Sequence, residues 1–251
     1  MIRSPLFLAA ALAALPSACA TFTPSTSAEG QHAYSFRKRV TQTVGARFLV
    51  YMPKGFRSRK DKKWPLIVFL HGSGERGDDV SRVAVNGPPK LAGQGRDFPF
   101  IIVSPQAPEN GAWSTDVLNA LLDEVLARLP IDPDRVYLTG LSMGGYGVWS
   151  WALDAPGRFA AIAPVSGLGD SDRACLLKTM PIWAVHGGQD PYVPLAGETE
   201  MIKAVNDCGG SAKFTVYPDS GHDVWTRTYD DPALYAWFLE HRRGESAPAV
   251  K

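Results

Sequence analysis

The sequence predicts an α/β fold, with a mainly parallel central sheet, helices on both faces and an antiparallel hairpin at its N-terminal end. Short apolar runs of strand length recur along the 251 residues, and segments with helical periodicity separate them. Continuous apolar runs of this kind are typical of parallel strands that are buried on both faces. Neither a repeat nor a linker interrupts the alternation, so we expect a single domain over residues 33–243.

The expected strands begin with two β-rich stretches on either side of Gly45, within residues 34–53, which favour an antiparallel hairpin. The first continuous apolar run is WPLIVFLHG, residues 64–72, which predicts a strand buried on both faces. Runs of the same kind occur at residues 99–105, 135–140, 159–167, 181–187 and 213–218.

Helical patterns fill the gaps between these runs. Residues 114–130 place their apolar side chains on one stripe, and Ser114 or Thr115 is the expected N-cap. The pattern in residues 197–210 ends on two glycines, as helices commonly do. Two further helices are expected at residues 145–153 and 231–243.

The first 20 residues have the layout of a secretory signal peptide: a charged start, an apolar run too short to span a bilayer, and then small residues. Ala18-Cys19-Ala20 is an A-x-A pattern that predicts cleavage after Ala20. Cys19 is an alternative site for a lipid anchor, although Pro16 stands where such signals usually carry leucine. Either alternative predicts export to the periplasm or outside the cell. We also expect disordered segments at residues 21–32 and 244–251.

Charge and cysteine content narrow the partners and the compartment. The net charge is +1 and the longest basic run is the RKR of residues 37–39, which argues against binding to nucleic acid. Two cysteines follow the leader, Cys175 and Cys208, and an even pair in an exported chain favours a disulfide. Two separately buried thiols are the alternative.

The stretch GLSMGG suggests a nucleophile. Gly140, Ser142 and Gly144 lie between a predicted strand and a predicted helix, the context that a G-x-S-x-G nucleophile elbow requires. The glycines are needed because larger side chains would collide across so tight a turn. The alternative is that Ser142 is a small residue in a glycine-rich bend. A nucleophilic serine needs a base, so the rest of the chain decides between the two interpretations.

The expected base is His222. In the hydrolase arrangement the acid and the base follow the serine along the chain. Of the five histidines, this order excludes His32 and His71. His186 lies at the end of an apolar strand, and Asp190 comes after it rather than before it. His241 lies beside two arginines on the terminal helix, where an exposed position is expected. His222, in the loop PDSGHDVW after the last strand, fits the order.

The expected acid is Asp190, which follows the strand at residues 181–187. The carboxyl ends of parallel strands meet at one edge of the sheet, where such sites assemble. An acid there would hold the tautomer of His222 and stabilise its imidazolium form. Asp170 and Asp172 follow an earlier strand and are the alternatives. Taken alone, Asp190 could also be a simple turn residue before proline.

An oxyanion hole needs two backbone N–H donors. One is expected from Met143, the residue after the nucleophile. The second is expected from Ser73 in the loop HGSGERG, with Gly72 or Gly74 as alternatives, because the glycines let the backbone approach a substrate closely. No G-K-[ST] follows this loop, so it does not resemble a phosphate-binding loop.

Loop side chains at the same edge suggest a substrate-binding surface. Gln106, Trp113 and Trp225 are the candidates, with Tyr146 beside them. Aromatic faces stack on sugars and phenolic rings, which favours a small-molecule or polysaccharide-linked ester as substrate. Half-buried packing is the alternative role for the two tryptophans.

The chain resembles the α/β-hydrolase superfamily over nearly all of its expected mature length. The blocks HGSGERGDD, NGPPK, FIIVSPQ, GLSMGGYGVW, HGGQDPYVP and YPDSGHDVWTRTY are similar to compact bacterial esterases of the phospholipase/carboxylesterase, dienelactone-hydrolase and feruloyl-esterase groups. The resemblance implies an α/β-hydrolase fold and a serine esterase with nucleophile Ser142, acid Asp190 and base His222. Dienelactone hydrolases use a cysteine nucleophile, so their substrate does not carry over.

Two other functions stay open from sequence alone. One is an oligopeptidase-like serine hydrolase, although no propeller or lid domain is present to select peptides. The other is a non-catalytic envelope protein that binds a ligand on a hydrolase fold. We expect no organic cofactor and no metal, because no other pair of His, Cys, Asp or Glu stands at ligand spacing.

Overall fold

The structure, a computed structural model, describes residues 41–59 and 61–244. The predicted signal peptide, the linker at residues 21–32 and residues 245–251 of the predicted tail lie outside the described residues. From Val44 onward, the described residues form one compact unit. Within the described ranges, no helix combines the length and the apolar character needed to cross a bilayer.

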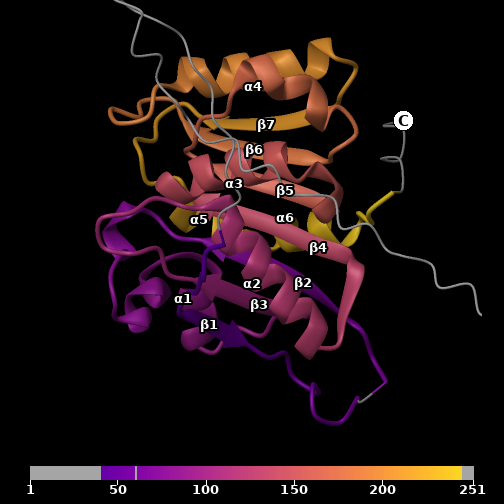
Figure 1. The fold of residues 1–251 in the computed structure, drawn as a ribbon. Helices are drawn as coiled ribbons and strands as arrows, with labels where there is room; N and C mark the ends of the chain where they lie inside the picture. The colour runs from indigo at the N-terminus through magenta and orange to yellow at the C-terminus, as the bar shows by residue number, and fades with distance from the viewer. Residues whose placement is uncertain (1–40, 60, 245–251) are drawn as a thin grey trace, which may run out of the picture. The chain divides into compact units, whose positions relative to one another are not determined.

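Seven strands of the described residues form one sheet in the order β1-β3-β2-β4-β5-β6-β7, which can be followed in Figure 1. All neighbours pair in parallel except β1 and β3, which pair antiparallel. The predicted, mainly parallel sheet with an antiparallel N-terminal extension is therefore confirmed. The strands are β1 (Phe48–Tyr51), β2 (Trp64–Leu70), β3 (Ile101–Pro105), β4 (Ile131–Leu141), β5 (Ala161–Val165), β6 (Ile182–Gly187) and β7 (Ala212–Tyr217).

The antiparallel partner of β1 is β3, not the segment that precedes it in the chain. Residues 41–47 form no strand, and residues 34–40 of the expected hairpin lie outside the described residues. Strand β1 therefore forms one edge of the sheet by pairing with a strand that is distant in the sequence.

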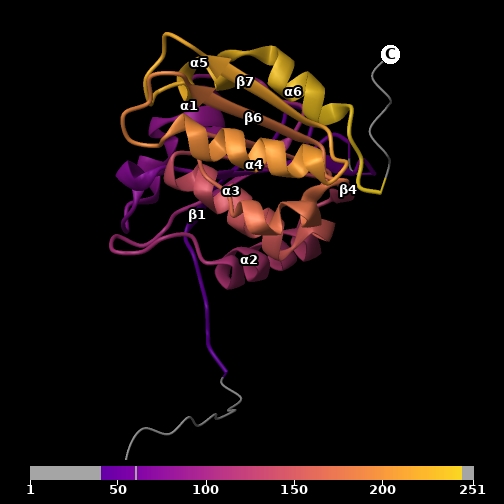
Figure 2. The same ribbon diagram turned by 90° about the horizontal axis from the view of Figure 1, so that it is seen from above.

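Helices cover both faces of the sheet, as Figure 2 shows. Helices α2, α3 and α4 lie on one face, and α1, α5 and α6 lie on the other. The four predicted helices correspond to α2, α3, α4 and α6, whereas α1 and α5 were not predicted. The helices are α1 (Gly87–Gly93), α2 (Thr115–Arg128), α3 (Met143–Asp154), α4 (Leu195–Asp207), α5 (Trp225–Asp230) and α6 (Pro232–Leu239).

The core has two apolar clusters, one on each face of the sheet. Along β2, Leu66, Val68 and Leu70 belong to the cluster under α2, α3 and α4. Ile67 and Phe69 point the other way, into the cluster under α5 and α6. Both faces of this strand are therefore buried, which explains why its sequence is apolar throughout.

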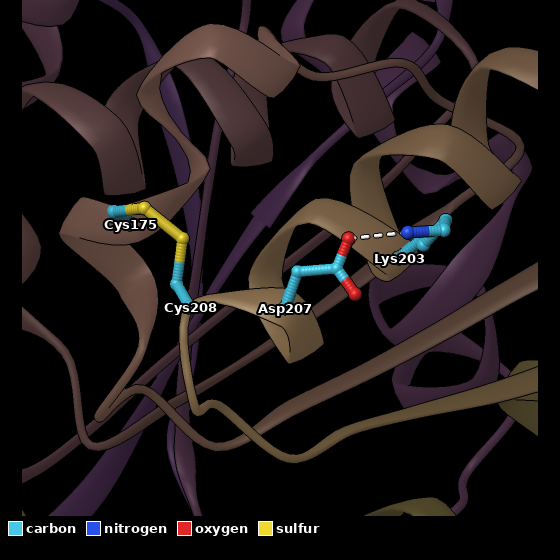
Figure 3. Close-up of a disulfide and its surroundings, with 4 residues drawn as sticks. All are labelled: Cys175, Lys203, Asp207 and Cys208. Carbon is cyan, nitrogen blue, oxygen red and sulfur yellow. Dashed lines mark hydrogen bonds and ion pairs between the residues drawn. A yellow bond between two sulfur atoms is a disulfide. The ribbon is translucent and has the colours of Figure 1, made fainter.

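Cys175 and Cys208 form the predicted disulfide, shown in Figure 3 with the Lys203–Asp207 ion pair on α4 beside it. The bond joins the connection between β5 and β6 to the end of α4, with the two Cα atoms 5.2 Å apart. It closes a loop of 33 residues. A loop of that length corresponds to about 3–4 kcal/mol of stability in the chain-entropy description.

Candidate active site

Ser142 occupies a sharp turn between β4 and α3. Its backbone angles are φ 52° and ψ −118°, a conformation that costs a non-glycine residue of order 1–3 kcal/mol. The turn is held from both sides: the Ser142 amide donates to Val165 O at 2.9 Å, and the Tyr146 amide donates to Ser142 O at 3.0 Å. The strain is therefore fixed by β5 on one side and by the first turn of α3 on the other.

The two glycines around Ser142 are required by close backbone approach. A Cβ at Gly144 would lie 2.0 Å from Leu70 O, and one at Gly140 would lie 2.7 Å from both Leu70 O and Gly144 O. No side chain fits at either position. The elbow thus packs directly on the end of β2, where the predicted oxyanion loop begins.

The structure brings Ser142, His222 and Asp190 together. His222 Nε2 lies 2.9 Å from Ser142 Oγ, and His222 Nδ1 lies 2.7 Å from Asp190 Oδ2. The carboxyl group accepts only, so Nδ1 carries the hydrogen and Nε2 is free to accept the serine proton. The Asp190 side chain is fully buried and that of His222 is 17% exposed.

Asp190 is held by its own turn as well as by His222. Its Oδ1 accepts hydrogen bonds of 2.9 Å from the amides of both Tyr192 and Val193. Burial alone would raise the pKa of Asp190, but the hydrogen bonds from His222 and these two amides outweigh burial and lower it. The carboxylate is therefore ionised over the range in which an esterase would work.

The loops that carry Asp190 and His222 touch one another through glycines. A Cβ at Gly187 would lie 1.9 Å from Gly221 O, and one at Gly188 would lie 2.7 Å from the Pro218 Cα. The Gln189 amide also donates to Ser220 O at 2.9 Å. These contacts fix the position of the Asp190 loop relative to the His222 loop at the carboxyl ends of β6 and β7.

Asp170, one of the alternative acids, has another role in the structure. Asp170 caps the 3₁₀ helix Ser171–Leu177 by accepting the Asp172 amide at 3.2 Å. The acid that contacts His222 is Asp190. Ser166, which sequence reasoning missed, donates to His222 O at 3.1 Å from a fully buried position at the end of β5.

The expected oxyanion donors lie where two helices begin. Met143 is the first residue of α3, and Ser73 is the first residue of the 3₁₀ helix Ser73–Glu75. Amides in the first turn of a helix have no intrahelical acceptor. A Cβ at Gly72 would lie 2.8 Å from Leu141 Cδ1, which places the start of the loop against the elbow.

His71 fixes the entry of this loop. Its ring Nε2 accepts the Ala107 amide at 3.0 Å, so Nδ1 carries the hydrogen and donates to Gly72 O at 2.6 Å. Burial lowers the pKa of His71, which keeps the ring neutral. Chain order excluded His71 as the base, but no sequence signal indicated this supporting role.

Gln106 and Trp113, expected at the substrate, support the same loop. The buried Gln106 amide donates to Glu75 O at 2.9 Å and to Asp79 O at 2.8 Å. The half-buried Trp113 donates to His71 O at 3.3 Å. Both also line a cavity of about 490 Å³ that Ser142 and His222 do not border. Their contacts therefore favour loop support over direct binding at the reacting groups.

Two aromatic rings contact His222, and a third aromatic residue follows Ser142 on α3. The Trp225 ring is perpendicular to the His222 ring at a centroid distance of 5.0 Å. Tyr192, which sequence reasoning missed, lies 5.3 Å from it and is 77% exposed. Tyr146, one turn of α3 after Ser142, is 40% exposed. The only signal for Tyr192 was its position two residues after Asp190.

The described residues contain no group of three or more His, Cys, Asp or Glu that could hold a metal ion. The site described above consists of side chains and backbone amides. Its arrangement suits an attack by the serine on a carbonyl carbon, with the base within hydrogen-bond distance of the serine oxygen.

Comparisons with known proteins indicate the hydrolysis of esters. The family described as "Putative esterase" matches residues 43–243. "Probable feruloyl esterase C" of Aspergillus terreus is 29% identical over 198 residues, covering 73% of this chain and 70% of its own. A poly(3-hydroxyoctanoate) depolymerase of Pseudomonas fluorescens is 26% identical over 230 residues, covering 79% of this chain and 81% of its own.

Solved structures agree as well. The crystal structure of a thermostable esterase has a TM-score of 0.67 and 30% identity to this chain, of which 78% is covered. The chain spans 59% of the length of that esterase. The chain therefore belongs to the esterase family of α/β-hydrolases and is a carboxylesterase-type hydrolase.

Proposed function

We propose that the protein is an exported serine esterase that works through Ser142, His222 and Asp190 and forms an acyl-enzyme. The observation that carries this proposal is the continuous set of contacts from Asp190 Oδ2 through His222 to Ser142 Oγ, at 2.7 Å and 2.9 Å. Each contact has the donor and acceptor roles that nucleophilic catalysis requires.

In this mechanism, His222 Nε2 removes the proton from Ser142 Oγ as the oxygen attacks the ester carbonyl carbon. The oxyanion of the tetrahedral intermediate binds to the amides of Met143 and Ser73. The C–O bond to the alcohol breaks, and His222 returns the proton to that oxygen. A water molecule then attacks the acyl-enzyme, with His222 again as base, and releases the acid and free Ser142.

The proposed substrates are phenolic or carbohydrate-linked esters. Tyr192 presents an exposed ring beside His222, and Tyr146 is exposed one turn of α3 after Ser142. Such rings stack on flat phenolic groups and on sugar faces. The similarity to the probable feruloyl esterase of Aspergillus terreus supports a phenolic acyl group in the substrate. Stacking on Tyr192 is therefore the interaction we expect to select the substrate.

Export is part of the proposal. The leader predicts cleavage after Ala20 or attachment of lipid at Cys19. The Cys175–Cys208 disulfide supports an oxidising compartment, because such bonds persist mainly in exported proteins.

The test is a panel of feruloyl, acetyl, butyryl and long-chain esters plus one peptide amide, measured with the wild type, Tyr192→Ala and Tyr192→Phe. Removing the exposed ring of Tyr192 is expected to raise KM for feruloyl esters by about 2- to 10-fold, the size of one aromatic stacking contact. KM for acetyl esters should not change, and Tyr192→Phe should behave like the wild type. An equal loss on every ester would count against stacking, and comparable cleavage of the amide would favour a peptidase.

A further inference from the structure

A second contact between an imidazole and a carboxyl group lies behind Asp190. His186 is at the end of β6 and Glu198 is in the first turns of α4, and both side chains are fully buried. His186 Nδ1 is in direct contact with Glu198 Oε2. The other oxygen, Oε1, accepts a hydrogen bond of 3.3 Å from Nε1 of Trp149, which is a buried residue of α3.

Hydrogen-bond chemistry places the protons of this pair. His186 Nε2 lies 2.9 Å from Val193 O, which can only accept, so Nε2 carries a hydrogen. The contact between Nδ1 and Glu198 Oε2 would join two acceptors unless a proton lies between them. The pair therefore holds that proton jointly and has no net charge, whichever atom carries it.

The pair reaches Asp190 by two routes. His186 Nε2 lies 3.4 Å from Asp190 Oδ2, the oxygen that accepts from His222. His186 also holds the carbonyl of Val193, whose amide donates to Asp190 Oδ1. Both oxygens of the acid thus depend on the position of His186.

Packing alone does not explain two ionisable groups at this depth. Apolar residues of similar volume are often as stabilising as a buried ion pair, or more so. Burial raises the pKa of Glu198 to about 7, against the opposing contacts with His186 and Trp149. Burial alone would lower the pKa of His186, but the contacts with Glu198 outweigh it and raise the pKa. The contact with Glu198 thus favours the protonated form of His186, the contact with His186 favours the ionised form of Glu198, and burial opposes a charge on either group.

We propose that His186 and Glu198 are a positioning pair that keeps the carboxylate of Asp190 directed at His222. Through Trp149, the pair also connects the loop of the acid to α3, the helix that begins directly after the nucleophile Ser142. This inference rests on the proposed function, since it assigns the pair a role only if Asp190 serves His222.

The first test is His186→Phe, which keeps an aromatic ring but removes the Nε2 hydrogen. We expect kcat on an ester substrate to fall by about 10- to 100-fold, because small displacements of a catalytic group have effects of this size. KM should not change. Glu198→Gln is the conservative variant: its amide can donate to His186 Nδ1 and accept from Trp149, so kcat should stay close to that of the wild type. His241→Phe replaces another buried histidine, next to α6, and should have no effect.

A double-mutant cycle separates positioning from general structural damage. If His186 acts through Asp190, His186→Phe should have almost no further effect on kcat in an Asp190→Ala background. A full and independent loss in that background would overturn the proposal, as would wild-type kcat in folded His186→Phe. If His186→Phe does not fold, Glu198→Met tests the pair from its other side with the same cycle and the same criteria.

Failure of the proposed function has a different signature. If Ser142→Ala and Asp190→Ala both hydrolyse esters as the wild type does, the proposed mechanism is wrong. If those two variants are inactive while His186→Phe and Glu198→Met are fully active, only the positioning pair is wrong.

The shared proton also predicts how stability depends on pH. Three titratable groups face the pair: Asp190, His222 on the loop after β7, and Tyr146 on α3. The pKa of Tyr146 is raised, first by burial and then by the charges of Asp190 and Glu198. The pKa of Glu198 rises from 4.5 to about 7 on folding, so its stabilisation is complete below pH 4.5 and is lost as the pH rises through about 7. The raised pKa of His186 describes the same shared proton, so the two shifts have the same direction and are not added.

Glu198→Gln has no carboxyl group to titrate, and burial then lowers the pKa of His186 instead of being outweighed. We therefore expect the Tm advantage of the wild type over Glu198→Gln to shrink as the pH rises from 4.5 to above 7. Thermal unfolding of both proteins across this range measures it. A difference that stays constant with pH would overturn the shared proton.

Discussion

Replacing Ser142 by alanine is expected to lower kcat for ester hydrolysis by at least about 10⁴-fold, because the proposed acyl-enzyme forms on the Ser142 hydroxyl group. His222 Nε2, 2.9 Å from Ser142 Oγ, would lose the hydroxyl group that it activates. The fold should survive, since alanine meets the same backbone strain at φ 52° and the amide of residue 142 can still bond to Val165 O. KM should change little, because the oxyanion donors and the exposed rings are intact.

The measurement is kcat/KM on the ester that the wild type hydrolyses fastest, together with labelling by a fluorophosphonate probe. Ser150→Ala is the matched control, because Ser150 is an exposed residue of α3, the helix that follows Ser142. The wild type and Ser150→Ala should hydrolyse the ester and take up one label, whereas Ser142→Ala should do neither. Hydrolysis by Ser142→Ala at the wild-type rate would refute the nucleophile, and a folded but inactive and unlabelled wild type would favour the binding-protein alternative.

The sheet was predictable because a strand buried on both faces must be apolar at every position. Residues 66–70 of β2 send alternate side chains into the two clusters, so no polar residue interrupts the run. The elbow was predictable for an equally local reason. Gly140 and Gly144 meet backbone atoms at 2.7 Å and 2.0 Å if given a Cβ, and a steric requirement of that kind appears directly in the sequence.

Two helices escaped prediction because tertiary contacts determine them. Helix α1 begins Gly-Pro-Pro, a composition typical of turns, and it forms where Gly87, at φ 68°, packs on Phe69 so closely that a Cβ would lie 2.6 Å from the ring. Helix α5 has six residues and includes threonine and aromatic residues that favour strands. Neither segment carries a helical apolar stripe of useful length.

The parts of the site that escaped prediction are contacts formed around the loop after β6. The order of Ser142, Asp190 and His222 along the chain follows from the connection of the strands, so motifs could suggest it. The contact of His186 with Glu198, and that of Tyr192 with His222, depend on how the loop after β6 turns back. Gln106 illustrates the opposite error: a polar side chain next to a predicted pocket satisfies the backbone of the oxyanion loop instead.

Replacing Asp190 by asparagine is expected to lower kcat by about 10⁴-fold without unfolding the protein. Every group that faces the carboxylate is a donor: the amides of Tyr192 and Val193 at Oδ1, and His222 Nδ1 together with His186 Nε2 at Oδ2. Asparagine has one acceptor oxygen for these two sides. Keeping that oxygen on the two amides turns its NH₂ group toward His222, which must then accept at Nδ1.

The hydrogen of the imidazole would then lie on Nε2 and point at Ser142 Oγ, so His222 could no longer take the serine proton. Kinetics of Asp190→Asn measure this effect, with Asp223→Asn as control, because Asp223 follows His222 directly and is exposed, bonding only to Thr226 among the contacts described. A kcat within about tenfold of the wild type would be too small a loss for a triad acid. That result would remove Asp190 from the mechanism and return attention to Asp170 and Asp172. A loss confined to Asp190→Asn would instead tie the rate to the tautomer of His222, since charge near the site changes in both variants but the hydrogen of the imidazole moves in only one.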